Sequence, residues 1–254
     1  MSLIPDTRLA CDTRCAANFN ERPAGASIAL LVLHYTGMES ADAAVERLCV
    51  EESQVSCHYL VHVDGGILQM VAEEKRAWHA GVSSWRGRDN CNDVSIGIEI
   101  VNPGHEFGYT AFAEAQIKAV TALSHDIAER HGLEARNIVA HSDIAPLRKE
   151  DPGELFPWDE LHAAGVGHWV DPEPVVSGRF LQKGDGGPPI AALRDMLRIY
   201  GYGLNEGDRF DDHLERVLIA FQRHFRPARI DGIADHSTVT TLHRLIKALP
   251  EGVA

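Results

Sequence analysis

The chain has 254 residues, of which 44% are hydrophobic and 24% are charged, close to the average for globular proteins. This length allows one or two domains, and the composition excludes a disordered chain, a collagen-like chain and a disulfide miniprotein. The sequence contains no apolar run long enough for a membrane span, and its net charge of −13 argues against binding to nucleic acid.

The N-terminal segment and the cysteines indicate a reducing compartment. Charged residues interrupt the first 15 positions, where a secretory signal peptide needs an apolar stretch. We therefore expect a cytoplasmic protein, or a periplasmic one if a signal peptide has been removed. The five cysteines show no repeating spacing and no CxxC pair, so neither a disulfide framework nor a zinc finger is predicted.

Residues 1–170 are predicted to form an α/β domain with a mixed central sheet flanked by helices. The apolar run at 28–33, which lies between two glycines, is typical of a buried strand. Asp64-Gly65-Gly66 predicts a hairpin turn. Further strands are expected at 58–63, 67–71, 94–101 and 137–140.

Helices are predicted between these strands. Ser40 can cap a helix that ends at Leu48. A longer helix is expected to begin at Thr110, and Gly132 stands where its C-cap would be.

A second, smaller domain is predicted over residues 178–254. Two prolines within 171–174 disfavour regular structure, so residues 171–177 are interpreted as a linker. Beyond the linker, apolar residues recur at helical spacing in three stretches, which predicts a three-helix domain. Its predicted core residues are Ile190, Leu193, Leu197 and Tyr200, then Leu214, Val217, Leu218, Phe221 and Phe225, then Val239, Leu242, Leu245 and Ile246.

Polar residues that could carry chemistry lie at the ends of predicted strands in the first domain. His34 and His141 each end a strand, and Asp151 follows in a loop rich in Pro and Gly. Two imidazoles and one carboxylate suit catalytic zinc, because a fourth position stays open for a reactive water. Glu99 lies within an apolar strand, on the face opposite its aliphatic neighbours, and Lys149 could place an ammonium group near the metal.

Each of these residues also has a simpler interpretation. A histidine beside an apolar strand is more often a core or surface residue than a ligand, and spacing alone does not connect His34 to His141. Glu99 could contact solvent at a sheet edge, and Lys149 could belong to a charged surface run. A Cys57–His58 nucleophile pair is also conceivable, but adjacent residues of a strand point to opposite faces.

Four motifs of the first domain resemble a known family. They are LHYTG (33–37), AWHAG (77–81), NDVSIGIEI (92–100) and HSDIAPLRKEDPG (141–153). Together they resemble the type 2 N-acetylmuramoyl-L-alanine amidases, an AmpD- and AmiD-like family that shares its fold with peptidoglycan recognition proteins. The resemblance covers about residues 25–160. Three stretches of the second domain resemble a three-helix peptidoglycan-binding domain, at 181–202, 210–225 and 230–242.

The resemblance implies a zinc enzyme with one zinc ion per chain. His34, His141 and Asp151 would bind the zinc, Glu99 would be the acid/base group, and Lys149 would stabilise the oxyanion. The expected reaction cleaves the amide between N-acetylmuramic acid, or its 1,6-anhydro form, and L-alanine of the stem peptide. A metal-bound water would be the nucleophile, and the process would be cell-wall recycling or turnover.

The resemblance also suggests substrate contacts. Trp78, His79, Arg88 and Asn92 match family positions near the cleft, and Arg88 could bind a stem-peptide carboxylate. The expected partners are peptidoglycan fragments or cell-wall glycan. One departure from the family pattern is Tyr35, which follows the first ligand where some recycling amidases carry Asn, so substrate preference does not transfer.

Three alternatives stay open from the sequence. The chain could be a muropeptide receptor or sensor without catalysis on the same fold, although receptors of this type commonly lose a metal ligand. It could be a phage or secreted lytic enzyme that acts on intact cell wall. The second domain could pack against the catalytic cleft or mediate dimerisation instead of binding glycan.

Overall fold

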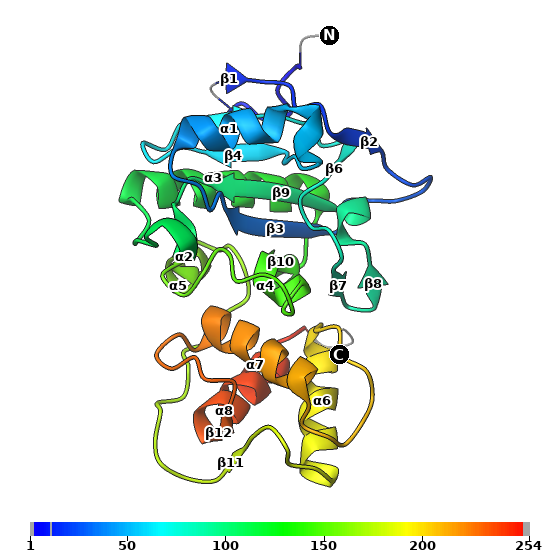
Figure 1. The fold of residues 1–254 in the computed structure, drawn as a ribbon, viewed down its shortest axis with the longest axis vertical. Coiled ribbons are helices and arrows are strands. Elements are labelled where there is room, and N and C mark those ends of the chain that lie inside the picture. Colours follow the sequence, from blue (N-terminus) through cyan, green and yellow to red (C-terminus); the bar gives the residue numbers. More distant parts are fainter. Residues whose placement is uncertain (1–2, 11, 251–254) are drawn as a thin grey trace.

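A computed structural model describes residues 3–10 and 12–250; Cys11 lies outside the described residues. Figure 1 shows a larger part built around a sheet and, below it, a smaller part built from three helices. This arrangement confirms the predicted fold class of a mixed α/β unit with an additional small helical unit. No helix among the described residues is both long and apolar enough to cross a membrane.

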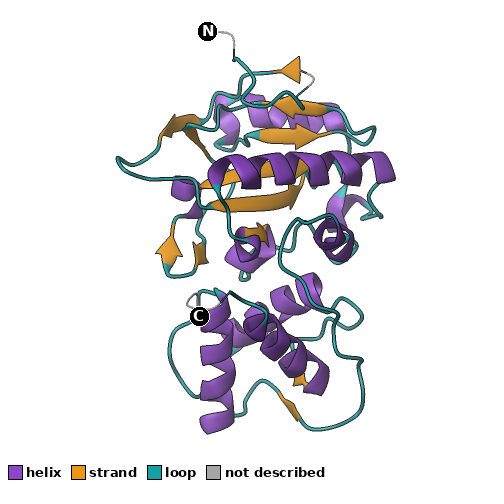
Figure 2. Ribbon diagram, turned by 180° about the vertical axis from the view of Figure 1, so that it is seen from behind, coloured by secondary structure: helices purple, strands orange, loops and turns teal. Residues whose placement is uncertain are grey.

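The larger part is organised around a six-stranded mixed sheet. Strands β4 and β5 are antiparallel, and the other neighbouring strands run parallel. Helix α1 (Ala41–Cys49) covers one face and helix α3 (Glu114–His131) covers the other (Figures 1 and 2). In spatial order the strands are β1 (Asp12–Thr13), β5 (Ile67–Gln69), β4 (Tyr59–Val61), β9 (Ser95–Ile100), β3 (Leu30–Tyr35) and β10 (Ile138–Ala140).

Short elements connect and extend this sheet. The additional strand pairs are β2 (Phe19–Glu21) with β6 (Lys75–Ala77) and β7 (Ser84–Trp85) with β8 (Arg88–Asp89). The short helices are α2 (Gly104–Phe107), α4 (His141–Ile144) and α5 (Trp158–Ala163), with 3-10 turns at Glu51–Ser53, Cys91–Val94 and Ala135–Asn137.

Alternation along the two central strands decides which side chains face the site. Leu31 and Leu33 of β3 pack in the core under α3, together with the isoleucines of β9. Residues of opposite parity, including His34 on β3 and Glu99 on β9, therefore share the other face of the sheet. The parallel register pairs His34 with Glu99, so these two polar residues lie side by side.

The two long helices of this part differ in how well their starts were predicted. Ser40 caps α1 as expected, with its side chain accepting a hydrogen bond from Ala43 N at 3.2 Å. The expectation that α3 begins at Thr110 is wrong, because this helix begins at Glu114. Asn102 Nδ2 donates to the Thr110 carbonyl at 2.8 Å and holds that segment outside the helix. Gly132 ends α3 with φ 61°, as predicted.

The smaller part contains α6 (Pro188–Tyr200), α7 (Asp212–Phe225) and α8 (His236–Lys247), with a short strand pair β11 (Phe180–Leu181) and β12 (Ala234–Asp235). Aspartates cap two of these helices: Asp211 accepts from Leu214 N at 2.9 Å, and Asp235 accepts from Thr238 N at 2.8 Å. The predicted apolar stripes of the three helices meet in one core.

The two parts pack against each other through apolar and aromatic side chains. The core of the three helices continues into buried residues of the larger part, among them Val32 and Ile144. The Trp85 and Tyr202 rings lie 5.1 Å apart, and the His224 ring stacks on Trp158 at 3.8 Å. The two parts thus share a buried interface, and the three-helix part is not a freely tethered module.

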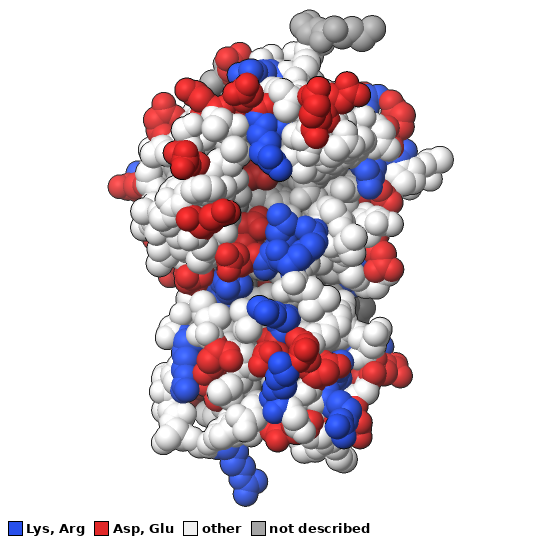
Figure 3. Space-filling view, in the orientation of Figure 1, with Lys and Arg blue, Asp and Glu red and all other residues white. Residues whose placement is uncertain are grey.

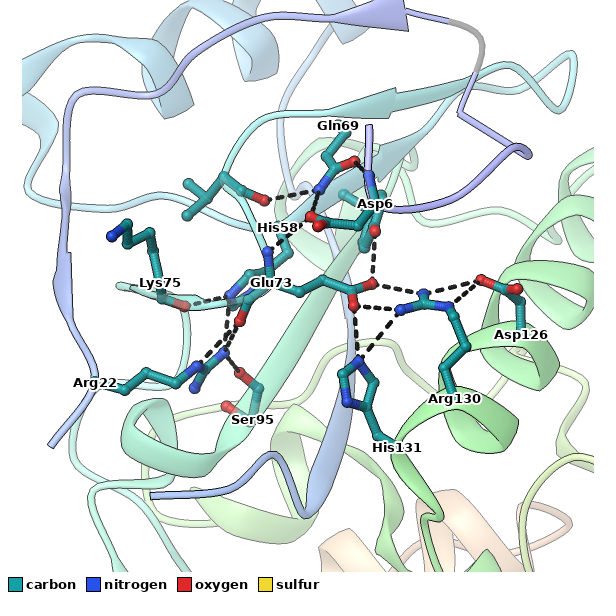
Figure 4. A network of polar contacts seen from close by, with 12 residues as sticks. Asp6, Arg22, His58, Gln69, Glu73, Lys75, Ser95, Asp126, Arg130 and His131 are labelled. Carbon is teal, nitrogen blue, oxygen red and sulfur yellow. Dashed lines mark hydrogen bonds and ion pairs between the residues drawn. The ribbon is translucent and has the colours of Figure 1, made fainter. Parts of the chain in front are cut away.

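A buried carboxylate ties α3 to the sheet. Figure 4 shows that Glu73 receives hydrogen bonds from Arg130 and His131, and the Tyr59 hydroxyl donates a further one. The Tyr59 hydroxyl lies 2.6 Å and Arg130 Nη2 lies 2.7 Å from the carboxylate. Burial alone would raise the pKa of Glu73, but these hydrogen bonds outweigh it and lower the pKa to about 2.

We predict that Glu73→Gln lowers the free energy of unfolding by about 2–4 kcal/mol at pH 7, because it removes the charge that Arg130 pairs with. Because the pKa of Glu73 is lowered on folding, its contribution is complete above the ordinary value of 4.5 and is lost as pH falls toward about 2. Urea unfolding at several pH values measures this. Glu74→Gln, at the exposed neighbouring position, is the control and should leave the profile unchanged. Equal profiles for both variants would contradict the prediction.

Candidate active site

Three buried side chains converge at the C-terminal edge of the sheet. His34 is near the end of β3, and His141 directly follows β10, which pairs in parallel with β3. Asp151 comes from the next loop, whose backbone is tied back by a 3.0 Å bond from Ser142 N to the Asp151 carbonyl. His34 Nδ1 lies 2.9 Å from His141 Nδ1, and Asp151 Oδ2 lies 3.1 and 3.0 Å from these nitrogens.

The outer nitrogens of both imidazoles have partners that orient the rings. His141 Nε2 donates to the Ala80 carbonyl at 3.1 Å, so its Nδ1 carries the lone pair. His34 Nε2 lies 3.0 Å from His79 Nδ1, which leaves His34 Nδ1 directed at the other two residues. Lone pairs of two imidazoles and one carboxylate thus point at a common centre, and such a donor set fits a divalent metal ion.

The electrostatics of this cluster favour metal-binding protonation states. Burial lowers the pKa of His34 to about 4, so its ring is neutral at pH 7. Burial acts to raise the pKa of Asp151, but His141 and His34 outweigh it and hold this pKa far below its ordinary value. Neutral imidazole and ionised carboxylate are the forms in which these residues bind metals.

Glu99 lies beside the three residues as an isolated acid. It neighbours His34 across the β3–β9 register, and its Oε2 is buried without a hydrogen-bond partner among the described residues. Burial raises the pKa of Glu99 well above its ordinary value; the charge of Asp151 raises it further, while Lys149 lowers it. A carboxyl group whose pKa is raised holds a proton more readily than an ordinary glutamate, which suits it to proton transfer.

These residues line an open pocket of about 350 Å³. Lys149 is exposed at the pocket, and Trp78 and Arg47 contribute to other parts of its wall. Figure 3 shows a hollow on this face of the larger part, with basic and acidic side chains gathered around it. The pocket therefore offers polar and charged groups, together with the aromatic rings of Trp78 and Tyr35, to a ligand that reaches the three buried side chains.

The residues expected to contact substrate divide into two groups. Trp78 lines the pocket, and His79 lines it with only 8% of its surface exposed. Arg88 and Asn92 are not among the residues that line this pocket. The β7–β8 hairpin instead carries Arg88 to a separate depression beside Trp85 and Cys91. In this structure Arg88 and Asn92 therefore do not line the pocket, and a substrate contact for either residue stays a prediction.

Asn92 and His79 support the metal-binding cluster from behind. Asn92 Oδ1 accepts hydrogen bonds from the backbone of His79 at 3.1 Å and of Ala80 at 2.7 Å. His79 Nδ1 then reaches His34, its Nε2 lies 3.0 Å from Ser95 Oγ, and the Ala80 carbonyl orients His141. The AWHAG segment therefore positions both ligand imidazoles.

Several of these supporting residues were missed from the sequence. Ala80 acts through its backbone, which no side-chain motif reveals, and Ser95 is one of many serines. Gly97 gave a usable signal as a glycine inside an apolar strand, since such a glycine often marks close approach of another group. A Cβ atom at position 97 would lie 2.5 Å from the His79 ring.

We predict that Gly97→Ala lowers the free energy of unfolding by about 1–3 kcal/mol, because the added methyl group must displace the His79 ring. The displaced ring should lose its contact with His34, so divalent-metal affinity should fall as well. Urea unfolding and metal titration of the apoprotein measure the two effects. Gly178→Ala is the control, since a Cβ atom there meets nothing within 4 Å and the backbone is not left-handed. Wild-type values for Gly97→Ala would contradict the prediction.

Fold and site together define a hydrolase of mixed α/β fold with a buried cluster suited to a metal ion. Comparison with known proteins identifies the family: residues 24–154 match the model described as N-acetylmuramoyl-L-alanine amidase, and the chain belongs to this family. Residues 186–242 match a second model, described as a putative peptidoglycan binding domain.

Similarity to individual proteins supports the assignment to this family. The chain is 40% identical over 237 residues to N-acetylmuramoyl-L-alanine amidase AmiD of Escherichia coli, covering 87% of this chain and 83% of AmiD. The crystal structure of AmpDh3 from Pseudomonas aeruginosa matches with a TM-score of 0.75 and 36% identity, covering 98% of this chain and all of AmpDh3. An AmpD structure matches with a TM-score of 0.56 and 31% identity; 99% of it corresponds to 64% of this chain.

Proposed function

We propose that this protein hydrolyses the amide bond between N-acetylmuramic acid, or its 1,6-anhydro form, and L-alanine of the stem peptide. The convergence of His34, His141 and Asp151 beside Glu99, inside an open pocket, is the observation that carries the proposal. A structure of AmiD, similar to this chain with a TM-score of 0.75, is described as a complex with the substrate anhydro-N-acetylmuramic acid-L-Ala-D-γ-Glu-L-Lys. A muropeptide of this kind is the substrate class we assign here.

We infer that His34, His141 and Asp151 hold a zinc ion, since two neutral imidazoles and one carboxylate are a zinc ligand set with an open position. When bound, zinc polarises a scissile carbonyl and makes a water nucleophilic at neutral pH. His79 and the Ala80 carbonyl keep the two imidazoles oriented toward the ion.

The chain's own side chains would supply the proton transfers and charge stabilisation. Glu99, with its raised pKa, would accept a proton from the attacking water and deliver it to the departing amine of L-alanine. Lys149 would place its ammonium group near the oxygen that gains negative charge. Trp78, half-buried on the pocket wall, would hold the sugar or the peptide backbone against its ring.

We predict that Glu99→Gln lowers kcat by about 10²–10⁴-fold while the protein still binds one zinc ion, because the amide cannot shuttle a proton. Release of free tripeptide from anhydromuramoyl tripeptide, followed by chromatography, measures turnover, and metal analysis measures zinc. Zinc without turnover in the wild-type protein would reject the amidase and support a muropeptide receptor instead. Turnover by Glu99→Gln at the wild-type rate would reject the role of Glu99.

We predict that Lys149→Met lowers kcat by about 10²–10³-fold with little change in KM, as expected for a group that acts on developing charge. Lys149 is exposed, so this substitution should leave the unfolding midpoint unchanged. Lys118→Met, at an exposed position on α3, is the matched control. A selective rise in KM would instead indicate that Lys149 binds the ground-state substrate.

We propose that the three-helix part binds peptidoglycan, on the strength of the family match over residues 186–242. Assaying the same protein on soluble anhydromuropeptide and on purified sacculi would separate recycling from attack on intact wall. Cosedimentation of zinc-free protein with sacculi would test binding apart from catalysis, and no cosedimentation would reject the binding role.

A further inference from the structure

The segment at 141–154, here called the ligand segment, carries three of the residues that the proposed reaction needs. It contains His141 and Asp151, and Lys149 lies between them. Apart from the short helix α4, the segment has no regular secondary structure. Its position therefore depends on side-chain and turn contacts, and within the larger part Tyr109 supplies one by donating to the Pro152 carbonyl at 2.8 Å.

The other side of the ligand segment contacts helix α7 of the three-helix part. Arg223 Nε lies 3.3 Å from Glu154 Oε2, and Arg223 Nη2 lies 3.5 Å from Glu150 Oε2. In the sequence, Glu150 lies between Lys149 and Asp151, and Glu154 follows Asp151 by three residues. Only 12% of the Arg223 side chain is exposed, so this guanidinium is held between the two parts of the protein and is not a free surface charge.

His105 connects the two glutamates that Arg223 contacts to the wall of the pocket. His105 Nε2 lies 3.2 Å from Glu154, and its Nδ1 lies 3.4 Å from Glu150 and 3.0 Å from the hydroxyl of Tyr35, which follows the ligand His34. His105, Glu150 and Tyr35 all line the pocket, whereas Arg223 does not. Without the guanidinium, the two glutamates would lose the cation that draws them together.

A second contact fixes the start of the ligand segment. Asp143 is fully buried and accepts hydrogen bonds from His224 Nδ1 at 2.6 Å and from the Tyr202 hydroxyl at 2.8 Å, both in the three-helix part. Its Oδ2 also accepts from Ala140 N at 2.8 Å, immediately before the ligand His141. The same carboxylate thus joins α7 to the strand end that presents a metal ligand.

We propose that Arg223 and His224 are positioning residues of the amidase site, and that the three-helix part completes that site in addition to any binding of glycan. They act through Glu150, Glu154 and Asp143 by holding the ligand segment in place. This inference rests on the proposed function.

Kinetics of Arg223 variants on a small soluble substrate test the proposal, because anhydromuramoyl tripeptide needs no glycan-binding domain. We expect Arg223→Gln to lower kcat by about 10–100-fold and to weaken zinc affinity, with KM little changed. Arg223→Lys keeps the charge and should recover part of kcat. Arg216→Gln is the matched control, since Arg216 lies two turns earlier on α7, is exposed, and its side chain has no hydrogen bond or ion pair among the described residues.

A merely structural bridge between the two parts would change the unfolding midpoint but not kcat at temperatures where every variant is folded. Equal kcat for Arg223→Gln and Arg216→Gln, with an active wild-type enzyme, overturns the proposal; an inactive wild-type enzyme overturns the proposed function instead. If Arg223→Gln does not fold, Glu154→Ala removes the shorter of the two Arg223 contacts from the other side, together with the contact between Glu154 and His105. That variant should then show the loss of kcat, and a wild-type value would overturn the proposal.

Discussion

The site depends on the parallel pairing of β3 with its two neighbours, β9 and β10. This pairing brings the C-terminal ends of the three strands to one edge of the sheet, and its register places His34 beside Glu99. Backbone hydrogen bonds fix the register. The side chains of His34, Glu99 and His141, which directly follows β10, are therefore set at their mutual distances before any ligand binds. A slip of one residue would turn His34 into the apolar core under α3 and destroy the site.

A shell of hydrogen bonds refines what the sheet provides. The segment from Trp78 to Ala80 crosses behind the two imidazoles, and Asn92 anchors it by accepting from two of its amides. His79 and the Ala80 carbonyl then fix the rings of His34 and His141. Metal-binding imidazoles need such partners, because each ring must present the correct nitrogen at a fixed angle. The positions of Asn92, His79 and Ala80 are therefore as important for the site as the positions of His34 and His141.

The smaller part is joined to this arrangement by more than its linker. Its helix α7 contacts the segment that carries His141 and Asp151, and its core continues into the larger part. A domain attached in this way has a fixed orientation, so any glycan it binds is presented at a constant distance from the pocket. The orientation of the three-helix part and the position of the segment with His141 and Asp151 therefore depend on the same buried contacts.

Five of the six strands in the main sheet, the three helices of the smaller part, the metal-ligand candidates and the family were predictable from the sequence, because periodicity and contiguous motifs are local properties. The sequence could not place Arg88 and Asn92 relative to the pocket. Their position in a motif does not show in which direction the β7–β8 hairpin turns, or with which backbone groups the buried side chain of Asn92 forms hydrogen bonds. The start of α3 was misplaced because a distant side chain, Asn102, holds Thr110 outside the helix. Only the tertiary structure decided that Arg223 and His224 reach the ligand segment, because such contacts join residues separated by about 70–80 positions, for which the sequence carries no local signal.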